Sequence, residues 1–63
     1  MNKYIRDHMG RLKGQIIENG NVVYIRNEHG QLKGQYIKSA DKTFDGQGHY
    51  FGNGDQLLRA LDS

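Results

Sequence analysis

Polar and apolar residues alternate along much of the chain, in short runs that end at turn residues. Residues 3–6 alternate charged with apolar or aromatic side chains, and residues 7–10 (Asp-His-Met-Gly) follow as a four-residue turn. A period of two is typical of a β-strand with one face in a core. Asn19-Gly20 predicts a type I′ reversal, whose two central residues need positive φ. The pattern therefore predicts antiparallel strands joined by tight turns.

The chain also repeats itself. Tyr4–Gln15 reads YIRDHMGRLKGQ and Tyr24–Gln35 reads YIRNEHGQLKGQ, with eight of twelve positions identical at a spacing of 20 residues. A third, degraded copy follows, in which the glycines recur at a spacing of 18 and the Tyr-Ile-Arg half is absent. We place the two missing residues in the connection at 39–42. Each copy is expected to be one supersecondary unit that buries its apolar side against its neighbours.

The expected hairpin registers sort the strand residues into two faces. The loop at 7–10 opposes Ile5 to Leu12, and the next reversal opposes Ile16 to Val23. Both registers place one set of residues on a common face, which we expect to be the core. The set consists of Ile5, Leu12, Gly14, Ile16, Val23, Ile25, Leu32, Gly34 and Tyr36. The repeated glycines are expected at a crowded centre, where a side chain would obstruct neighbouring backbone.

The end of the chain predicts a helix. Asp55 is an N-cap candidate, and the residues after it are good helix formers. Leu57, Leu58 and Leu61 lie on one stripe, and a helix of two turns forms only if that stripe docks. We therefore expect one all-β domain: an antiparallel meander of about six short strands, closed or petal-like, with a short C-terminal helix. The expected repeat copies span about 4–21, 24–41 and 42–54, and the helix about 55–62.

Size and composition narrow the class of protein. A chain of 63 residues buries only about 60% of its unfolded surface when it folds alone, so its core is thin. The absence of cysteine removes disulfides and thiolate zinc sites, which leaves oligomerisation as the expected remedy. The absence of cysteine also fits a reducing compartment, and no segment is as apolar as a membrane span. We therefore expect a cytoplasmic protein. The net charge of +2 is only mildly basic and leaves nucleic-acid binding open.

The repeated motif resembles a known family. Tyr-Ile-Arg-Asp-x-x-Gly-Arg-Leu-Lys-Gly, its second copy and a final Phe-Asp-x-x-Gly-x-Tyr-x-Gly are similar to the small bacterial and phage proteins described as four-fold β-flowers. The resemblance covers Tyr4 to Leu61 and implies short hairpins arranged like petals around an axis. It brings no activity, cofactor or catalytic residue, so no site follows from it.

The second face combines basic and aromatic residues at its loop end. Arginines interleaved with aromatic rings are suited to holding phosphates and stacking on bases. Basic residues on a sheet also discourage edge-to-edge association, which is the plainer explanation of this cluster. We hypothesise a ligand-binding site for an anionic small molecule or nucleic acid at Tyr4, Arg6, Lys13, Tyr24, Arg26 and Lys33.

The same face is apolar at its other end, where Ile17, Val22, Ile37 and Phe44 gather. A large uncovered apolar patch is unusual in a soluble monomer. We expect it to be covered either by the C-terminal helix, through Leu57, Leu58 and Leu61, or by a second subunit.

Catalytic and metal chemistry find little support in the sequence. The three histidines lie in turns beside acids, without the spacing of metal ligands, and turn polarity explains them. There is no cysteine, and neither serine falls near a histidine, so no activated nucleophile is indicated. We expect a non-catalytic small β-repeat binding module, acting as a homo-oligomer, with a possible protein partner and without metal or cofactor. The alternative is an anionic-ligand binder, for example a phage-type nucleotide-sequestering protein.

Overall fold

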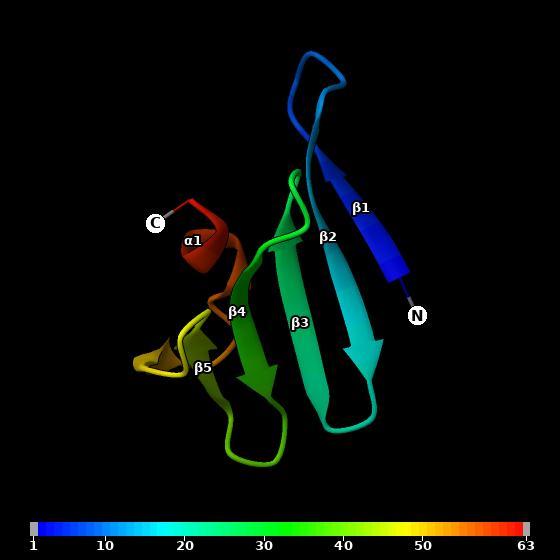
Figure 1. Cartoon of the computed structure of the whole chain (residues 1–63). Helices are drawn as coiled ribbons and strands as arrows, with labels where there is room; N and C mark the ends of the chain where they lie inside the picture. The colour runs from blue at the N-terminus through cyan, green and yellow to red at the C-terminus, as the bar shows by residue number, and fades with distance from the viewer. Residues whose placement is uncertain (1, 63) are drawn as a thin grey trace.

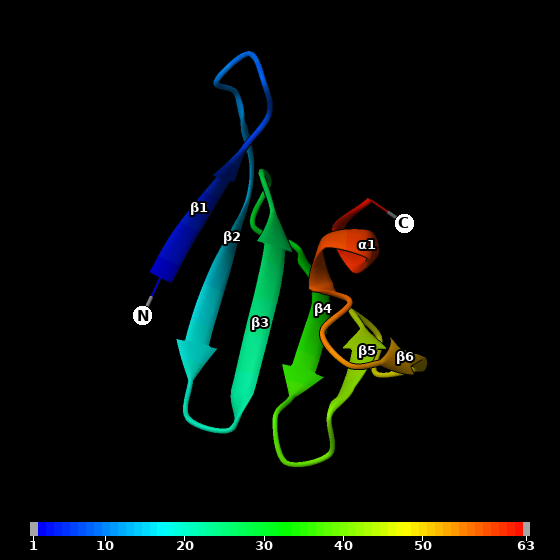
Figure 2. The ribbon, with the colours of Figure 1, turned by 180° about the vertical axis from the view of Figure 1, so that it is seen from behind.

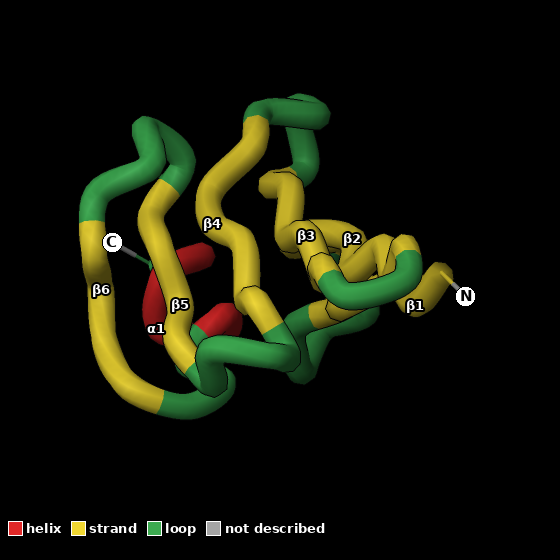
Figure 3. Tube along the Cα trace, turned by 90° about the horizontal axis from the view of Figure 1, so that it is seen from below, coloured by secondary structure: helices red, strands yellow, loops and turns green. Residues whose placement is uncertain are grey.

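A computed structural model describes residues 2–62 as six strands and one short helix (Figure 1). The elements are β1 (Asn2–Arg6), β2 (Leu12–Asn19), β3 (Val22–Asn27), β4 (Leu32–Ile37), β5 (Lys42–Asp45), β6 (Tyr50–Asn53) and α1 (Leu57–Leu61). Each strand pairs antiparallel with the next, which confirms the predicted meander with its C-terminal helix. The closed form of the sheet, one of the two predicted, is wrong: the sheet is open, because within the described residues β1 and β6 are its two edges. Figure 3 shows how strongly the sheet twists between these edges.

The sequence repeat is a repeat of strand pairing. Three equivalent pairs carry it: Ile5 with Gly14, Ile25 with Gly34, and Thr43 with Gly52. Each pair is followed toward the loop by a one-residue register shift, a β-bulge. The third copy has lost the Tyr-Ile-Arg sequence but keeps the strand: Lys-Thr-Phe at 42–44 takes its place in β5. The two-residue deletion lies between Ile37 and Lys42, as predicted.

The register of the first hairpin differs from the predicted one by two residues. Ile5 opposes Gly14 rather than Leu12. One residue of the difference comes from the loop, which closes when the backbone N–H of Asp7 donates to the carbonyl of Arg11 at 2.9 Å. The other comes from the bulge. A register shift of one residue would turn the side chains to the opposite face, but the two shifts together return Ile5 and Gly14 to the predicted face.

The reversal after β2 is displaced as well. Asn19 opposes Val22, so the two central residues are Gly20 and Asn21 rather than Asn19 and Gly20. Gly20 has a φ of 61°, whereas Asn21 has no positive φ. This combination fits a type II′ turn, which needs glycine at its first central position, rather than the predicted type I′ turn. The register of β2 against β3 moves by two residues, which leaves the faces unchanged.

The buried side of α1 differs from the predicted leucine stripe. Leu57 and Ala60 are buried, with exposed fractions of 2% and 0%, and Leu61 is half-buried. Leu58, in contrast, is 60% exposed. Residues three and four apart share one side of a helix, so burying Leu57 with Ala60 and Leu61 turns Leu58 outward.

The repeated glycines lie where α1 approaches the sheet. A Cβ on Gly34 would be 3.0 Å from the Cβ of Ala60, and a Cβ on Gly14 would be 3.2 Å from Cδ1 of Leu61. The fully buried Ile25 lies beside Gly34, with its Cγ2 3.5 Å from the same hypothetical atom. The crowded centre expected from the sequence is thus the contact between sheet and helix.

Thr43 fastens the helical segment to the sheet. Its hydroxyl is fully buried, donates to the carbonyl of Gly54 at 2.6 Å and accepts the backbone N–H of Gln56 at 3.0 Å. Gln56 is the N-cap residue of α1, one position later than the predicted Asp55. Because Thr43 occupies the position of Ile25 in the repeat, replacing isoleucine by threonine supplies the anchor for the C-terminal segment.

Candidate binding face

The two faces of the sheet differ in what covers them. Residues that oppose each other on neighbouring strands point to the same side, so the pairing assigns every paired residue to a face. We call the side with Gly14, Ile25 and Gly34 the helix face, because α1 packs there against β3 and β4 (Figure 2). The other side is the open face. Its paired residues are Asn2, Tyr4, Arg6, Leu12, Gln15, Ile17, Asn19, Val22, Tyr24, Arg26, Leu32, Gln35, Ile37, Lys42, Phe44, Tyr50 and Asn53.

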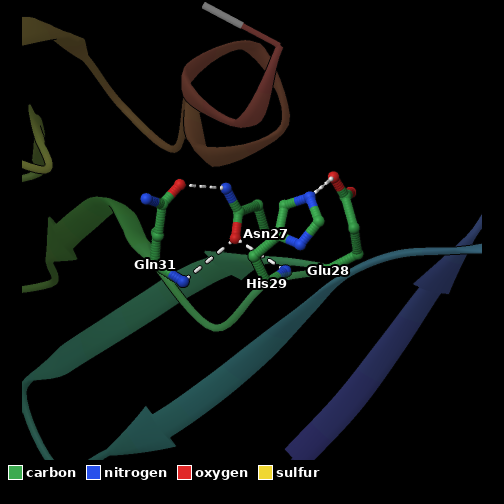
Figure 4. Close-up of polar contacts among 4 residues, drawn as sticks. All are labelled: Asn27, Glu28, His29 and Gln31. Atoms are coloured by element: carbon green, nitrogen blue, oxygen red, sulfur yellow. Dashed lines mark hydrogen bonds and ion pairs between the residues drawn. The ribbon is translucent and has the colours of Figure 1, made fainter.

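Three loops of one design, at residues 7–11, 27–31 and 45–49, stand at the same end of the sheet. In each, Oδ1 of the first residue accepts the backbone N–H groups two and four positions later, at 2.9–3.0 Å. The glycine three positions later has a φ between 82° and 90° and donates its N–H to the first carbonyl. In the middle loop Asn27 also donates from Nδ2 to Oε1 of Gln31 at 2.8 Å (Figure 4). Aspartate or asparagine suits the first position, since both offer this oxygen.

Two of these loops hold an arginine in the same way. Nη1 of Arg6 donates to the carbonyl of Gly10 at 3.0 Å, and Nη1 of Arg26 donates to the carbonyl of Gly30 at 2.9 Å. Both side chains are exposed. A guanidinium group has five N–H donors, so one bond to a loop carbonyl positions it without exhausting it. The open face thus carries two equivalent, oriented cations at its loop end.

The two lysines of the hypothesised site are not among the paired residues of the open face. Lys13 and Lys33 are the residues passed over at the bulges of β2 and β4. The ammonium group of Lys13 reaches Oδ1 of Asp62, just after α1, at 3.2 Å. The structure therefore brings Tyr4 and Arg6 together on the open face, and Tyr24 with Arg26, but ties Lys13 to the end of the helix.

Aromatic and glutamine side chains cross the open face from edge to edge. This aromatic band consists of Tyr4, Gln15, Tyr24, Gln35, Phe44 and Tyr50. The last four oppose one another in a single row, whereas Tyr4 and Gln15 lie two residues nearer the loops, because Gln15 opposes Arg26 and not Tyr24. Tyr4 and Tyr50 at its ends are 60% and 56% exposed. The rings of Phe44 and Tyr50 meet edge to face, with centroids 6.2 Å apart. Tyr50 was not predicted on this face, because only the bulge brings it opposite Phe44. The glutamines could have been predicted, because Gln is repeated in the motif.

The predicted apolar cluster, Ile17, Val22, Ile37 and Phe44, also lies on the open face. Val22 opposes Ile37 directly, and all four side chains are half-buried. The helix does not cover them, because Ala60 and Leu61 pack on the helix face against Gly34 and Gly14. Of the two covers expected from the sequence, the second subunit stays a prediction.

Charge is unevenly distributed between the faces. The paired residues of the open face include Arg6, Arg26 and Lys42 and no acid. Glu18 and Asp45 belong to the helix face, while the other acids lie in loops, turns and the C-terminal segment. A hydrogen bond from Lys38 lowers the pKa of Glu18, and the backbone N–H of His49 lowers the pKa of Asp45. Among the paired strand residues, the open face is thus positive.

Each of the three loops contains one histidine. Nε2 of His29 lies 3.3 Å from Oε1 of Glu28, and Nδ1 of His49 lies 3.7 Å from Oδ2 of Asp45. Across residues 2–62, no three or more His, Asp or Glu side chains come close enough together to hold a metal ion.

Comparison with known proteins assigns no role to these residues. No family model matches the chain, and neither a curated protein nor a solved structure does. The resemblance to β-flower proteins therefore stays a prediction. Within the described part of the chain, no helix has the length and apolar character needed to cross a membrane.

Proposed function

We propose that this chain is a non-catalytic β-repeat binding module that acts as a homo-oligomer through its open face. The observation that carries the proposal is the apolar cluster, in which Val22 and Ile37 lie side by side without a helix over them. Uncovered apolar patches mark interaction surfaces. Only Ile25, Leu57 and Ala60 are buried hydrophobic residues in the described chain, so a second copy would extend a small core. The cytoplasmic location stays a prediction.

A charge placed in the cluster tests this assembly. Val22→Lys puts an ammonium group opposite Ile37, and we expect sedimentation velocity to show dissociation to monomers, since an unpaired charge in an apolar interface is costly. Leu58→Lys is the matched control, because Leu58 is exposed on the helix side and its charge should leave the oligomer intact. A monomeric wild-type protein, or dissociation by Leu58→Lys alone, contradicts the proposed interface.

The second candidate function is the capture of an anionic ligand, a nucleotide or nucleic acid, at the loop end of the same face. Two observations favour it: Arg6 and Arg26 are oriented identically by loop carbonyls, and the paired residues around them include no acid. A cationic surface with oriented guanidinium groups is suited to phosphate oxygens.

A further inference from the structure

We propose that the aromatic band binds single-stranded nucleic acid, with bases stacked on its tyrosine rings and phosphates held by Arg6 and Arg26, while Phe44 stays in the apolar cluster and supports Tyr50 from its edge. The inference rests on the second candidate function and names its ligand. It adds residues that the repeated basic and aromatic motif alone does not indicate. These are Gln15, Gln35 and Tyr50.

The geometry of the band favours an extended ligand. Its tyrosines come from β1, β3 and β6, and strands in a sheet lie about 4.8 Å apart, so Tyr4 and Tyr24 are separated by roughly 10 Å across the strands and additionally along them, because Tyr4 lies two residues nearer the loops. A row of separated rings on a sheet can stack several bases of one strand in turn. Glutamines on the strands between them offer donors and acceptors to base edges. A duplex could not use such a row, because its bases are already stacked on each other.

A compact nucleotide would need a pocket instead, since small ligands are bound in concave sites. The molecule has two grooves, of ≈ 300 and ≈ 290 Å³. One is beside Gly46 and Gln47, and the other lies between Ile16 and Leu57. Neither is lined by a ring of the band, so the band offers a surface rather than a pocket.

Charge selects a polyanion over an apolar or acidic partner. The band is flanked by Arg6 and Arg26 at one end and by Lys42 on the strand of Phe44. No acidic side chain belongs to the same paired set. An acidic peptide would satisfy the arginines, but it would leave the exposed Tyr4 and Tyr50 rings without stacking partners. Stacking and phosphate contact together match a single strand.

Fluorescence anisotropy with a labelled oligothymidylate of about 12 nucleotides tests the inference. We expect the wild-type protein to bind it more tightly than a duplex of the same length, with an affinity that falls as salt rises. Tyr4→Ala should weaken binding about tenfold at unchanged salt dependence, because it removes one stacking platform. Tyr4→Phe keeps the ring and should bind like the wild type. Arg6→Gln should reduce the slope of log affinity against log salt by about 0.7.

Three outcomes of the oligonucleotide titrations overturn the inference. They are a flat titration at low salt, equal binding of the single strand and the duplex, and wild-type affinity of Tyr4→Ala. A thermal shift on adding ATP without binding of the oligonucleotide would leave the second candidate function standing and remove the single-strand ligand. Binding of an acidic peptide in place of the oligonucleotide would also reject it. Sedimentation velocity of the same samples measures the homo-oligomer independently, so failure of the homo-oligomer proposal can be told apart from failure of the single-strand proposal.

Discussion

Thr43 is the residue on which the position of α1 depends, and Thr43→Val isolates the role of its hydroxyl. Valine has nearly the same shape and is fully compatible with a strand. The change removes the donor to the Gly54 carbonyl and the acceptor of the Gln56 N–H, while leaving the packing of the methyl group in place. Loss of stability would therefore report the hydrogen bonds rather than a cavity.

The expected magnitude follows from the two groups left behind. A buried polar group without a partner costs about 1–3 kcal/mol, and both Gly54 and Gln56 are only partly buried, so we take the lower value for each. The total is about 2 kcal/mol, which corresponds to a fall in Tm of roughly 8–16 °C for a domain of this size. Thr43→Ser keeps the hydroxyl and loses one methyl group, and should cost only about 1 kcal/mol.

Thermal unfolding followed by circular dichroism measures all three proteins. The predicted order of stability is wild type, then Thr43→Ser, then Thr43→Val, although valine is the more hydrophobic replacement. If Thr43→Val is as stable as the wild type, the hydroxyl does not anchor the C-terminal segment.

Two further predictions concern the loops. In urea unfolding, Gly46→Ala should cost about 2–3 kcal/mol of stability, because its Cβ would lie 2.2 Å from the backbone carbonyl oxygen of Leu32. Gly10→Ala, with a φ of 83° and open space around it, should cost only about 1 kcal/mol. Equal losses of stability would mean that the carbonyl of Leu32 moves to make room. Since the pKa of Asp45 is lowered in the folded protein, its carboxylate contributes to folding stability at neutral pH, and this contribution is lost as the pH falls below about 4. Asp45→Asn, which copies Asn27, should fold and should lose less stability in acid than the wild type. An unchanged dependence of stability on acid pH would contradict this.

Much of the fold was predictable because the signals are local. Alternation, turn residues and the internal repeat predicted six antiparallel strands and placed Ile25 and Gly34 on the core side. The shortened spacing of the third copy located the deletion before β5. These features depend on neighbouring residues in the chain, which is why the sequence alone was sufficient for them.

The bulges were not predictable from alternation. A bulge adds one residue to one strand while the polar pattern continues unchanged, so Leu12 was expected in the core but opposes Arg6, and Leu12 is 39% exposed. Leu32 and Tyr50 are displaced in the same way, opposite Arg26 and Phe44. The complete aromatic band therefore becomes apparent only with the observed registers.

The contacts of the C-terminal segment depended on its return path across the sheet. Nothing local distinguishes Leu58 from Leu57, and their separation into exposed and buried residues follows from the docking of α1 over Gly14 and Gly34. Lys13 was assigned to the basic cluster, but its partner Asp62 lies 49 positions along the chain. Long-range pairs of this kind leave no trace in a single sequence.

The central claim is that the open face is the binding face, and NMR chemical-shift mapping with unlabelled oligothymidylate tests it most directly. The account predicts that the largest backbone amide shifts fall at Tyr4, Gln15, Tyr24, Gln35 and Tyr50, while Gly34 and Leu57 on the helix side stay unchanged. Shifts concentrated at the groove on the helix side that Ile16 and Leu57 line, or no shifts at saturating oligonucleotide, would contradict it.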